Sequence, residues 1–237
     1  MGCPLALGAS LCRWGTGMPT HRPACPAFLA LLAASGCIPV EADVAASSHP
    51  ALTAHAAPLQ PAESVVFLGR SAADDDDLPD CVRDALAELS PETKIVAPEA
   101  FRSRSGSRFA RPDASLKDDE VAGLLADPAA QQAVAALAVR YLFLVDGKTS
   151  ESGYSASGTM GVAASSSYQS TGIKATIWDA RETRAVGQFS AFASGRPGMT
   201  MIMFITVWEY TPTESIACER MAGEIQRFLA SGYAPDS

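Results

Sequence analysis

The apolar positions between residues 63 and 230 change repeatedly from strand spacing to helix spacing. Val65–Leu68 and Lys94–Ala97 are short, mainly apolar runs, which are typical of buried strands. Between them, Leu78–Leu89 repeats apolar residues at helical spacing. A helical segment over Asp118–Val139 leads into the apolar run Arg140–Val145, which is typical of a central strand.

The second half of this region predicts a hairpin and a final helix. Residues 150–170 are rich in Ser, Gly and Ala and give little signal. Residues 173–192 alternate on both sides of the polar turn Asp179–Thr183, which predicts a β-hairpin. An apolar stripe over Thr213–Ala230 predicts a helix.

This order of elements predicts an α/β (α+β) domain. We expect a mixed sheet of about five strands in the order β-α-β-α-β-β-β-α, with the helices mainly on one face. The segment that feeds Val139–Val145 forms a crossover, which we expect to be right-handed.

The apolar segment Met199–Trp208 is too short to cross a bilayer as a helix. Three interpretations remain open for it: a buried strand, a Met-rich docking surface, or one strand of a membrane hairpin. The side chains available for docking are Met201, Met203, Phe204 and Trp208.

The N-terminal region has the layout of a bacterial secretion signal. Residues 28–37 read FLALLAASGC, and no acidic residue precedes Glu41. The last four of these, Ala34 to Cys37, resemble the lipobox of bacterial lipoproteins, in which the chain is cut before the cysteine and lipid is attached to its sulfur. The resemblance implies a signal peptide over 1–36, with Met18 as an alternative start, and lipidation of Cys37.

The region after this cysteine predicts a tether and then one domain. Residues 37–62 are rich in Ala, Pro and Ser and predict a flexible tether, followed by a single globular domain over 63–232. Ile38 follows the cysteine where some lipoproteins carry Asp, which resembles the default sorting to the outer membrane, facing the periplasm.

Charge argues against nucleic acid as a partner. The chain has 18 basic and 26 acidic residues, a net charge of −8. Removal of residues 1–36 takes away Arg13 and Arg22, leaving 16 basic residues and a charge of −10. Nucleic-acid binding depends on clustered Lys and Arg against phosphate, so an acidic chain of this kind is a poor candidate.

Cysteine and histidine usage limits the chemistry further. Beyond Cys37, only Cys81 and Cys218 remain, and we predict that they form a disulfide; two buried thiols are the alternative. The histidines of the mature chain, His49 and His55, lie in the tether. Histidine-dependent catalytic triads and zinc sites are therefore not expected in the domain, and we predict no metal and no cofactor.

Four arginines form a basic segment without acidic neighbours. They are Arg102, Arg104, Arg108 and Arg111, interleaved with serines. Such a segment fits either a binding patch for phosphate or an acidic partner, or a mobile surface loop.

Residues 136–147, which read ALAVRYLFLVDG, resemble an element shared by TolB amino-terminal domains, penicillin-binding-protein activator lipoproteins and the curli secretion lipoprotein CsgG. The hairpin with Trp178-Asp179 resembles a turn in the same group, although Thr183-Arg184 replaces Thr-Gly. The resemblance covers residues 63–230 by element order. It implies action by binding and assembly, and it carries over no catalytic residue.

These observations predict a non-catalytic binding or assembly module held to the membrane by lipid on Cys37. Its partner is expected to be an envelope protein or further copies of the chain. One alternative is an envelope enzyme that uses carboxylates such as Asp146, Glu151 and Asp179. Another is an oligomeric secretion or pore component that uses segments 150–170 and 198–210 as membrane hairpins.

Overall fold

The computed structural model describes residues 38–41, 44–53, 55–70, 77–106, 116–159, 162–202 and 205–232. These residues form nine strands and five helices. The strands are β1 (Ile38–Glu41), β2 (Val44–Leu52), β3 (Ser64–Gly69), β4 (Lys94–Val96), β5 (Val139–Thr159), β6 (Val162–Asp179), β7 (Arg184–Gly195), β8 (Gly198–Ile202) and β9 (Ile205–Tyr210). The helices are α2 (Leu78–Leu89), α3 (Pro98–Ser105), α4 (Asp118–Leu125), α5 (Pro128–Ala136) and α6 (Thr213–Ser231).

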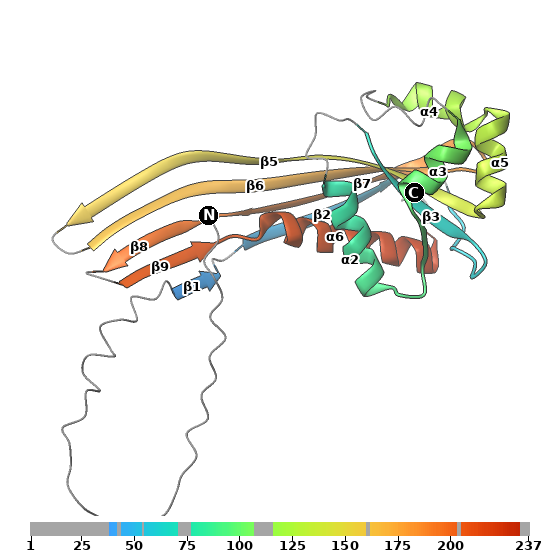
Figure 1. Ribbon diagram of the computed structural model, residues 1–237. Coiled ribbons are helices and arrows are strands. Elements are labelled where there is room, and N and C mark those ends of the chain that lie inside the picture. The colour runs from blue at the N-terminus through green and yellow to red at the C-terminus, as the bar shows by residue number, and fades with distance from the viewer. Residues whose placement is uncertain are drawn as a thin grey trace, which may run out of the picture. The chain divides into compact units, whose positions relative to one another are not determined.

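All nine strands belong to one mixed sheet (Figure 1). Its main path runs β1-β9-β8-β6-β5-β3-β4, while β7 and then β2 continue the sheet beside the second half of β6. Strands β3, β4 and β5 pair in parallel, whereas β5, β6 and β7 pair antiparallel. The mixed α/β class is confirmed, but the expected number of about five strands is too low.

The additional strands come from segments with little large apolar content. Strand β5 has 21 residues and β6 has 18, so both run through the Ser- and Gly-rich region 150–170. The apolar segment 198–210 forms a hairpin of two strands, β8 and β9, rather than one buried strand.

The expected tether also contains strands. β1 pairs in parallel with β9, and β2 pairs antiparallel with β7 along nine residues, from Val44 opposite Gly195 to Leu52 opposite Gly187. Small residues suffice here because β2 lies at an edge of the sheet. The expectation of a flexible coil over the whole of 37–62 is therefore wrong for 38–41 and 44–52.

The helices cover both faces of the sheet (Figure 1), which corrects the expectation of one face. α2 and α6 pack on one face, called here the α6 face, and α3, α4 and α5 pack on the other. The connection from β3 to β4 moves one way along the sheet, and the connection from β4 to β5 returns past β3. Right-handed crossovers in opposite directions place their helices on opposite faces.

Alternate residues of β5 point into two separate apolar clusters. Tyr141 and Phe143 are fully buried beneath α2 and α6, whereas Leu142 and Leu144 are fully buried beneath α4 and α5. A strand that is buried on both faces needs a continuous apolar sequence, which explains the uninterrupted run in this part of β5.

Aromatic packing and a disulfide hold α6 in place. The Phe228 ring makes edge-on contacts with Tyr141 and Phe189, at centroid distances of 4.9 and 5.7 Å. The predicted disulfide between Cys81 of α2 and Cys218 of α6 is present in the structure. The two helices of the α6 face are therefore joined covalently as well as by packing.

Candidate interaction surface

Part of the sheet extends beyond the helices, and this part is called the arm (Figure 1). The arm comprises residues 150–159 of β5 and 162–170 of β6, together with β8, β9 and β1. The remainder of the folded chain, from β2 and β3 to the helices, is called the body. None of the arm's described side chains is buried, because no helix packs on either face of it.

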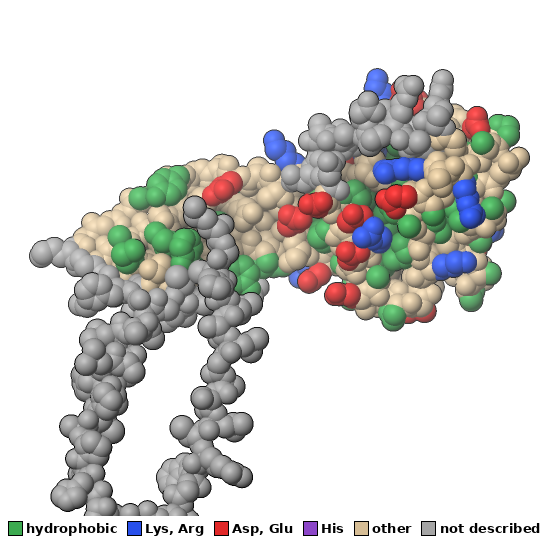
Figure 2. Space-filling model, in the orientation of Figure 1, with side chains coloured by type: hydrophobic (Ala, Val, Ile, Leu, Met, Phe, Trp, Pro, Cys, Tyr) green, Lys and Arg blue, Asp and Glu red, His purple; other side chains and the backbone are tan. Residues whose placement is uncertain are grey.

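The arm is nearly free of charge. Residues 152–173 and 197–208 contain no Asp, Glu, Lys, Arg or His, although 19% of the chain is Asp, Glu, Lys or Arg. Glu151 and Lys174 border the first of these uncharged stretches, and Arg196 and Glu209 border the second. Figure 2 shows the same separation, with acidic and basic side chains concentrated on the body.

Exposed apolar and aromatic side chains gather on the arm, where Figure 2 shows them in green. Among the described residues, nine large hydrophobic side chains are exposed, and seven of these lie on the arm. The seven are Tyr154, Val162, Tyr168, Met201, Ile202, Trp208 and Tyr210. Exposed apolar side chains that cluster in this way mark a contact surface rather than an ordinary protein surface.

Hydroxyl pairs across the strands stabilise the arm in place of an apolar core. The hydroxyls of Ser150 and Ser170 are 3.0 Å apart, and those of Ser155 and Ser166 are 2.9 Å apart. Directly opposite Ser and Thr side chains contribute modestly to pairing, on the order of 0.2–1 kcal/mol per pair. The arm is therefore a hydrogen-bonded ribbon that continues the central strands of the body.

An irregularity in β5 shapes one face of the arm. The register shifts between Ser152 and Ser155, and Gly153 within the shift has a φ of +67°, a conformation that glycine adopts without strain. Tyr154 is 78% exposed there. A groove of about 440 Å³ runs beside it, with Met199 and Trp208 among its lining residues.

The acidic candidates for catalysis are spread along β5 and β6. Asp146 forms an ion pair with Arg70 at 3.0 Å, and Asp179 is buried opposite Tyr141 of the neighbouring strand. Asp146 is five positions beyond Tyr141 on β5, and Glu151 is five positions further, so successive carboxylates lie about 17 Å apart along the sheet. Glycosidase pairs require about 5–9.5 Å, so these three carboxylates do not form such a pair.

Asp179 instead organises the turn between β6 and β7. Its carboxylate accepts hydrogen bonds from the backbone N–H groups of Arg181 and Glu182, both at 3.1 Å, and pairs with Arg140 at 2.6 Å. A hydrogen bond from Arg184 lowers the pKa of the neighbouring Glu182. These charges stabilise a turn of the body, at a distance from the arm.

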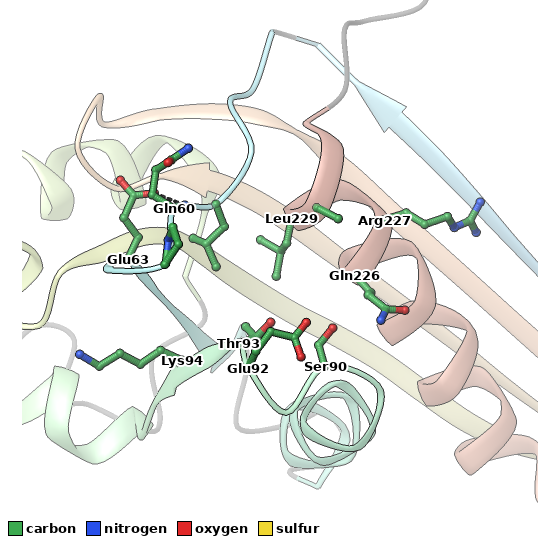
Figure 3. A pocket seen from close by; sticks show the side chains of 12 residues that line it. Gln60, Glu63, Ser90, Glu92, Thr93, Lys94, Gln226, Arg227 and Leu229 are labelled. Atoms are coloured by element: carbon green, nitrogen blue, oxygen red, sulfur yellow. Dashed lines mark hydrogen bonds between the residues drawn. The ribbon is translucent and has the colours of Figure 1, made fainter.

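A second hollow lies in the body, between the loop before β3, the loop before β4 and the end of α6 (Figure 3). Its volume is about 500 Å³. Glu63 within it pairs with Arg181 at 2.7 Å, and Gln226 donates a hydrogen bond to the Leu89 carbonyl at 2.9 Å. Because these polar groups are engaged within the chain, the hollow is a weaker candidate than the arm.

The structure separates the two sets of residues expected to bind a partner. Met201 and Trp208 are exposed on the arm, whereas Met203 and Phe204 lie outside the described residues, as does Cys37. Two arginines of the basic segment belong to the body instead. Arg102 and Arg104 occupy the last turn of α3, where their positive charges interact favourably with the helix dipole. Arg108 and Arg111 lie outside the described residues.

Sequence reasoning missed five of the exposed residues on the arm, namely Tyr154, Val162, Tyr168, Ile202 and Tyr210. The missing charge in 152–173 and 197–208 is the signal that could have found them.

In the part of the chain that the structure describes, no three His, Cys, Asp or Glu residues lie close enough together to hold a metal ion. No helix in that part is long and apolar enough to cross a membrane.

The sequence matches no protein-family model and no curated protein sequence. Among solved structures, the chain is similar to a PelC dodecamer from Paraburkholderia phytofirmans, with 13% identity, a TM-score of 0.39, and coverage of 78% of this chain and 99% of that chain. It is also similar to lipoprotein GNA1162 from Neisseria meningitidis, with 11% identity, a TM-score of 0.30, and coverage of 70% of this chain and 99% of that chain. At such low TM-scores, these similarities assign neither a family nor a function to the chain.

Proposed function

We propose that this chain is a lipid-anchored protein of the bacterial envelope that acts as a non-catalytic binding or assembly module. Cys37 carries the lipid, and the protein faces the periplasm from the outer membrane. The observation that carries the proposal is the pairing of β1 with β9, because β1 begins at Ile38, directly after the lipobox cysteine. The nearly uncharged arm therefore begins directly after the proposed anchor residue.

The arm also supports a role in assembly. Within the part of the chain that the structure describes, β5 pairs only with β6 beyond residue 145, so no described strand covers the other edge of residues 150–159. An open strand edge can add a strand from another chain. The proposed partner at this edge is an envelope protein or a second copy of the chain.

The alternatives have less support. The carboxylates considered for an envelope enzyme lie too far apart to act as a pair. A pore built from two membrane hairpins needs strands of about 9–11 residues, whereas β8 and β9 have 5 and 6.

Lipid attachment is tested by expressing the full chain in a bacterium supplied with alkyne-labelled palmitate. We expect label on the wild-type protein, no label on Cys37→Ser, and undiminished label on Cys25→Ser. If both variants keep the label, the proposal is contradicted. Exchange of the sorting residue, Ile38→Asp, is expected to move the labelled protein from the outer-membrane fraction to the inner-membrane fraction.

Assembly is tested by measuring the mass of the labelled protein in mild detergent. A mass of several chains identifies a second copy as the partner. A monomer leaves the envelope protein as the partner, to be captured from membranes by the lipidated form but not by a variant with Ser155→Pro at the open edge. Capture that is equally efficient with this variant would contradict the role of the edge.

A further inference from the structure

The side chains of the arm change from apolar at its far end to charged nearer the body. Val162 of β6, Ile202 of β8 and Ile205 of β9 are level with one another in the register and mark the far end, called the tip. Val162 and Ile202 are 41% and 47% exposed. Trp208 lies three residues back from the tip, or about 10 Å, and the first charge, Glu209, lies about 13 Å back.

The tip exposes apolar side chains on both faces of the sheet. Ile202 is paired with Val162, and alternation along β8 directs the preceding Met201 to the other face. Met199, on the same face as Met201, is paired with Trp208. A protein partner packed on one face would leave the other face uncovered, whereas a lipid layer surrounds both.

The proposed anchor leaves the protein at this same end. β1 runs parallel to β9, with Ile38 beside Val207 and Glu41 beside Tyr210. Because β9 runs from the tip toward the body, Ile38 is at the tip-side end of β1. Cys37 directly precedes Ile38 in the sequence. A lipid on Cys37 is therefore attached next to the tip-side end of β1.

We infer that the tip of the arm inserts into the interfacial layer of a phospholipid bilayer and forms a second membrane contact beside the lipid of Cys37. The inference rests on the proposed function for the position of the lipid. An interfacial element sinks about 5–10 Å into the boundary between headgroups and acyl chains, which immerses Val162, Met201 and Ile202. At that depth Trp208 lies among the headgroups, where tryptophan is enriched, and Glu209 stays in water.

The tip adds a membrane contact to the lipid without the cost of bringing a charge into the bilayer. The strength of an interfacial contact grows with the apolar area that it buries.

The test uses residues 37–237, which form one compact unit, with Cys37→Ser so that no lipid is attached. This unit has two tryptophans: Trp208, 47% exposed at the arm, and Trp178, 4% exposed in the body. Trp178→Phe leaves Trp208 as the only tryptophan, which is excited selectively over the tyrosines at long wavelength. Vesicles of phosphatidylethanolamine and phosphatidylglycerol in a three-to-one ratio (on the order of typical bacterial mixtures) carry brominated acyl chains, which quench a tryptophan that enters the interface.

We expect the Trp208 emission to shift to shorter wavelength and to be quenched on addition of vesicles. Ile202→Asp should weaken partitioning into the vesicles at least about tenfold, because it replaces an apolar side chain that the bilayer would bury with a charged one. Leu89→Asp is the matched control, since Leu89 is 45% exposed on α2 of the body, and it should partition like the parent protein.

Three results would overturn the inference. One is the absence of shift and quenching with a folded protein. Another is equal partitioning of the Ile202→Asp and Leu89→Asp variants. The third is a blue-shifted Trp208 without vesicles in a protein whose mass is that of several copies, because the tip is then covered by another chain. Since the test protein carries no lipid, failure here leaves the palmitate labelling result standing, and a failed labelling experiment leaves this assay valid.

Discussion

The Cys81–Cys218 disulfide is expected to contribute a large part of the stability of the body. The bridge joins α2 to α6 across 137 residues of chain, including every strand from β4 to β9. In the chain-entropy model, closing a loop of this length stabilises the fold by about 5 kcal/mol, and native disulfides deliver about 2–5 kcal/mol. Cys218 is 1% exposed, so its replacement by Ala leaves only a small cavity to add to this loss.

Urea unfolding of residues 37–237 with Cys37→Ser measures the effect. Oxidised protein is compared with reduced protein and with the double variant Cys81→Ala, Cys218→Ala. With a urea dependence of about 2–3 kcal/mol per molar, the midpoint should fall by about 1–2 M in both comparisons. Reduced and oxidised proteins with the same midpoint would refute the reasoning. A double variant that is much less stable than the reduced protein would assign the loss to packing instead of the bridge.

Three further predictions concern the body. Phe228→Ala should lower the free energy of unfolding by about 3–5 kcal/mol, because the ring is fully buried, and calorimetry that finds less than about 1 kcal/mol would contradict this. Gly147→Ala should destabilise the fold by about 1–3 kcal/mol, because the added Cβ would lie 2.6 Å from a backbone oxygen. Gly123→Ala is the control, since the space around this glycine is open, and calorimetry should find it neutral or stabilising. Burial raises the pKa of Tyr141 above its ordinary value of 10, so the folded state favours the neutral phenol. The stability that this gives is present below pH 10 and is lost as the pH rises further. Tyr141→Phe should therefore remove this loss of stability at alkaline pH, measured as the free energy of unfolding from about pH 9 to 12.

The sequence predicted those elements whose side chains are buried. Strand β3, the first part of β5 and the helices α2 and α6 lie close to their expected positions, because burial imposes apolar runs or helical spacing on the sequence. The hairpin of β6 and β7 was predicted for the same reason. Where a strand has little to bury, the same reasoning finds little signal.

The arm and the N-terminal strands show that limit. Residues 150–159 pair through backbone and hydroxyl groups, and their side chains are all exposed, so no apolar period is required of them. Strand β2 consists mainly of small residues because it completes an edge of the sheet. The placement of helices on both faces follows from the strand order, which depends on contacts between segments far apart in the chain and cannot be obtained from local periodicity.

The candidate surface was only partly predictable. Met201 and Trp208 were singled out because they lie in an unusual apolar segment, but whether that segment was core or surface stayed open. The structure assigns it to the surface because β8 pairs with the exposed half of β6. The expected tether is replaced in part by paired strands, because β1 and β2 join the sheet. The arm, to which β1 belongs, is about 30 Å long over the nine residues of β6 that belong to it.

The most direct test of the account is the position of Ile38, since it decides whether the proposed anchor leaves from the tip or from a loose tether. In residues 37–237 with Cys37→Ser, cysteines are introduced as Ile38→Cys with Val207→Cys, and separately as Ile38→Cys with Ser190→Cys on β7 as the control. Neighbouring parallel strands bring paired positions about 4.8 Å apart, within the range that a disulfide spans. We predict rapid and complete cross-linking of the 38–207 pair and none of the 38–190 pair, measured by mass spectrometry after oxidation. Free thiols at 38 and 207, or equal cross-linking of both pairs, would contradict the account.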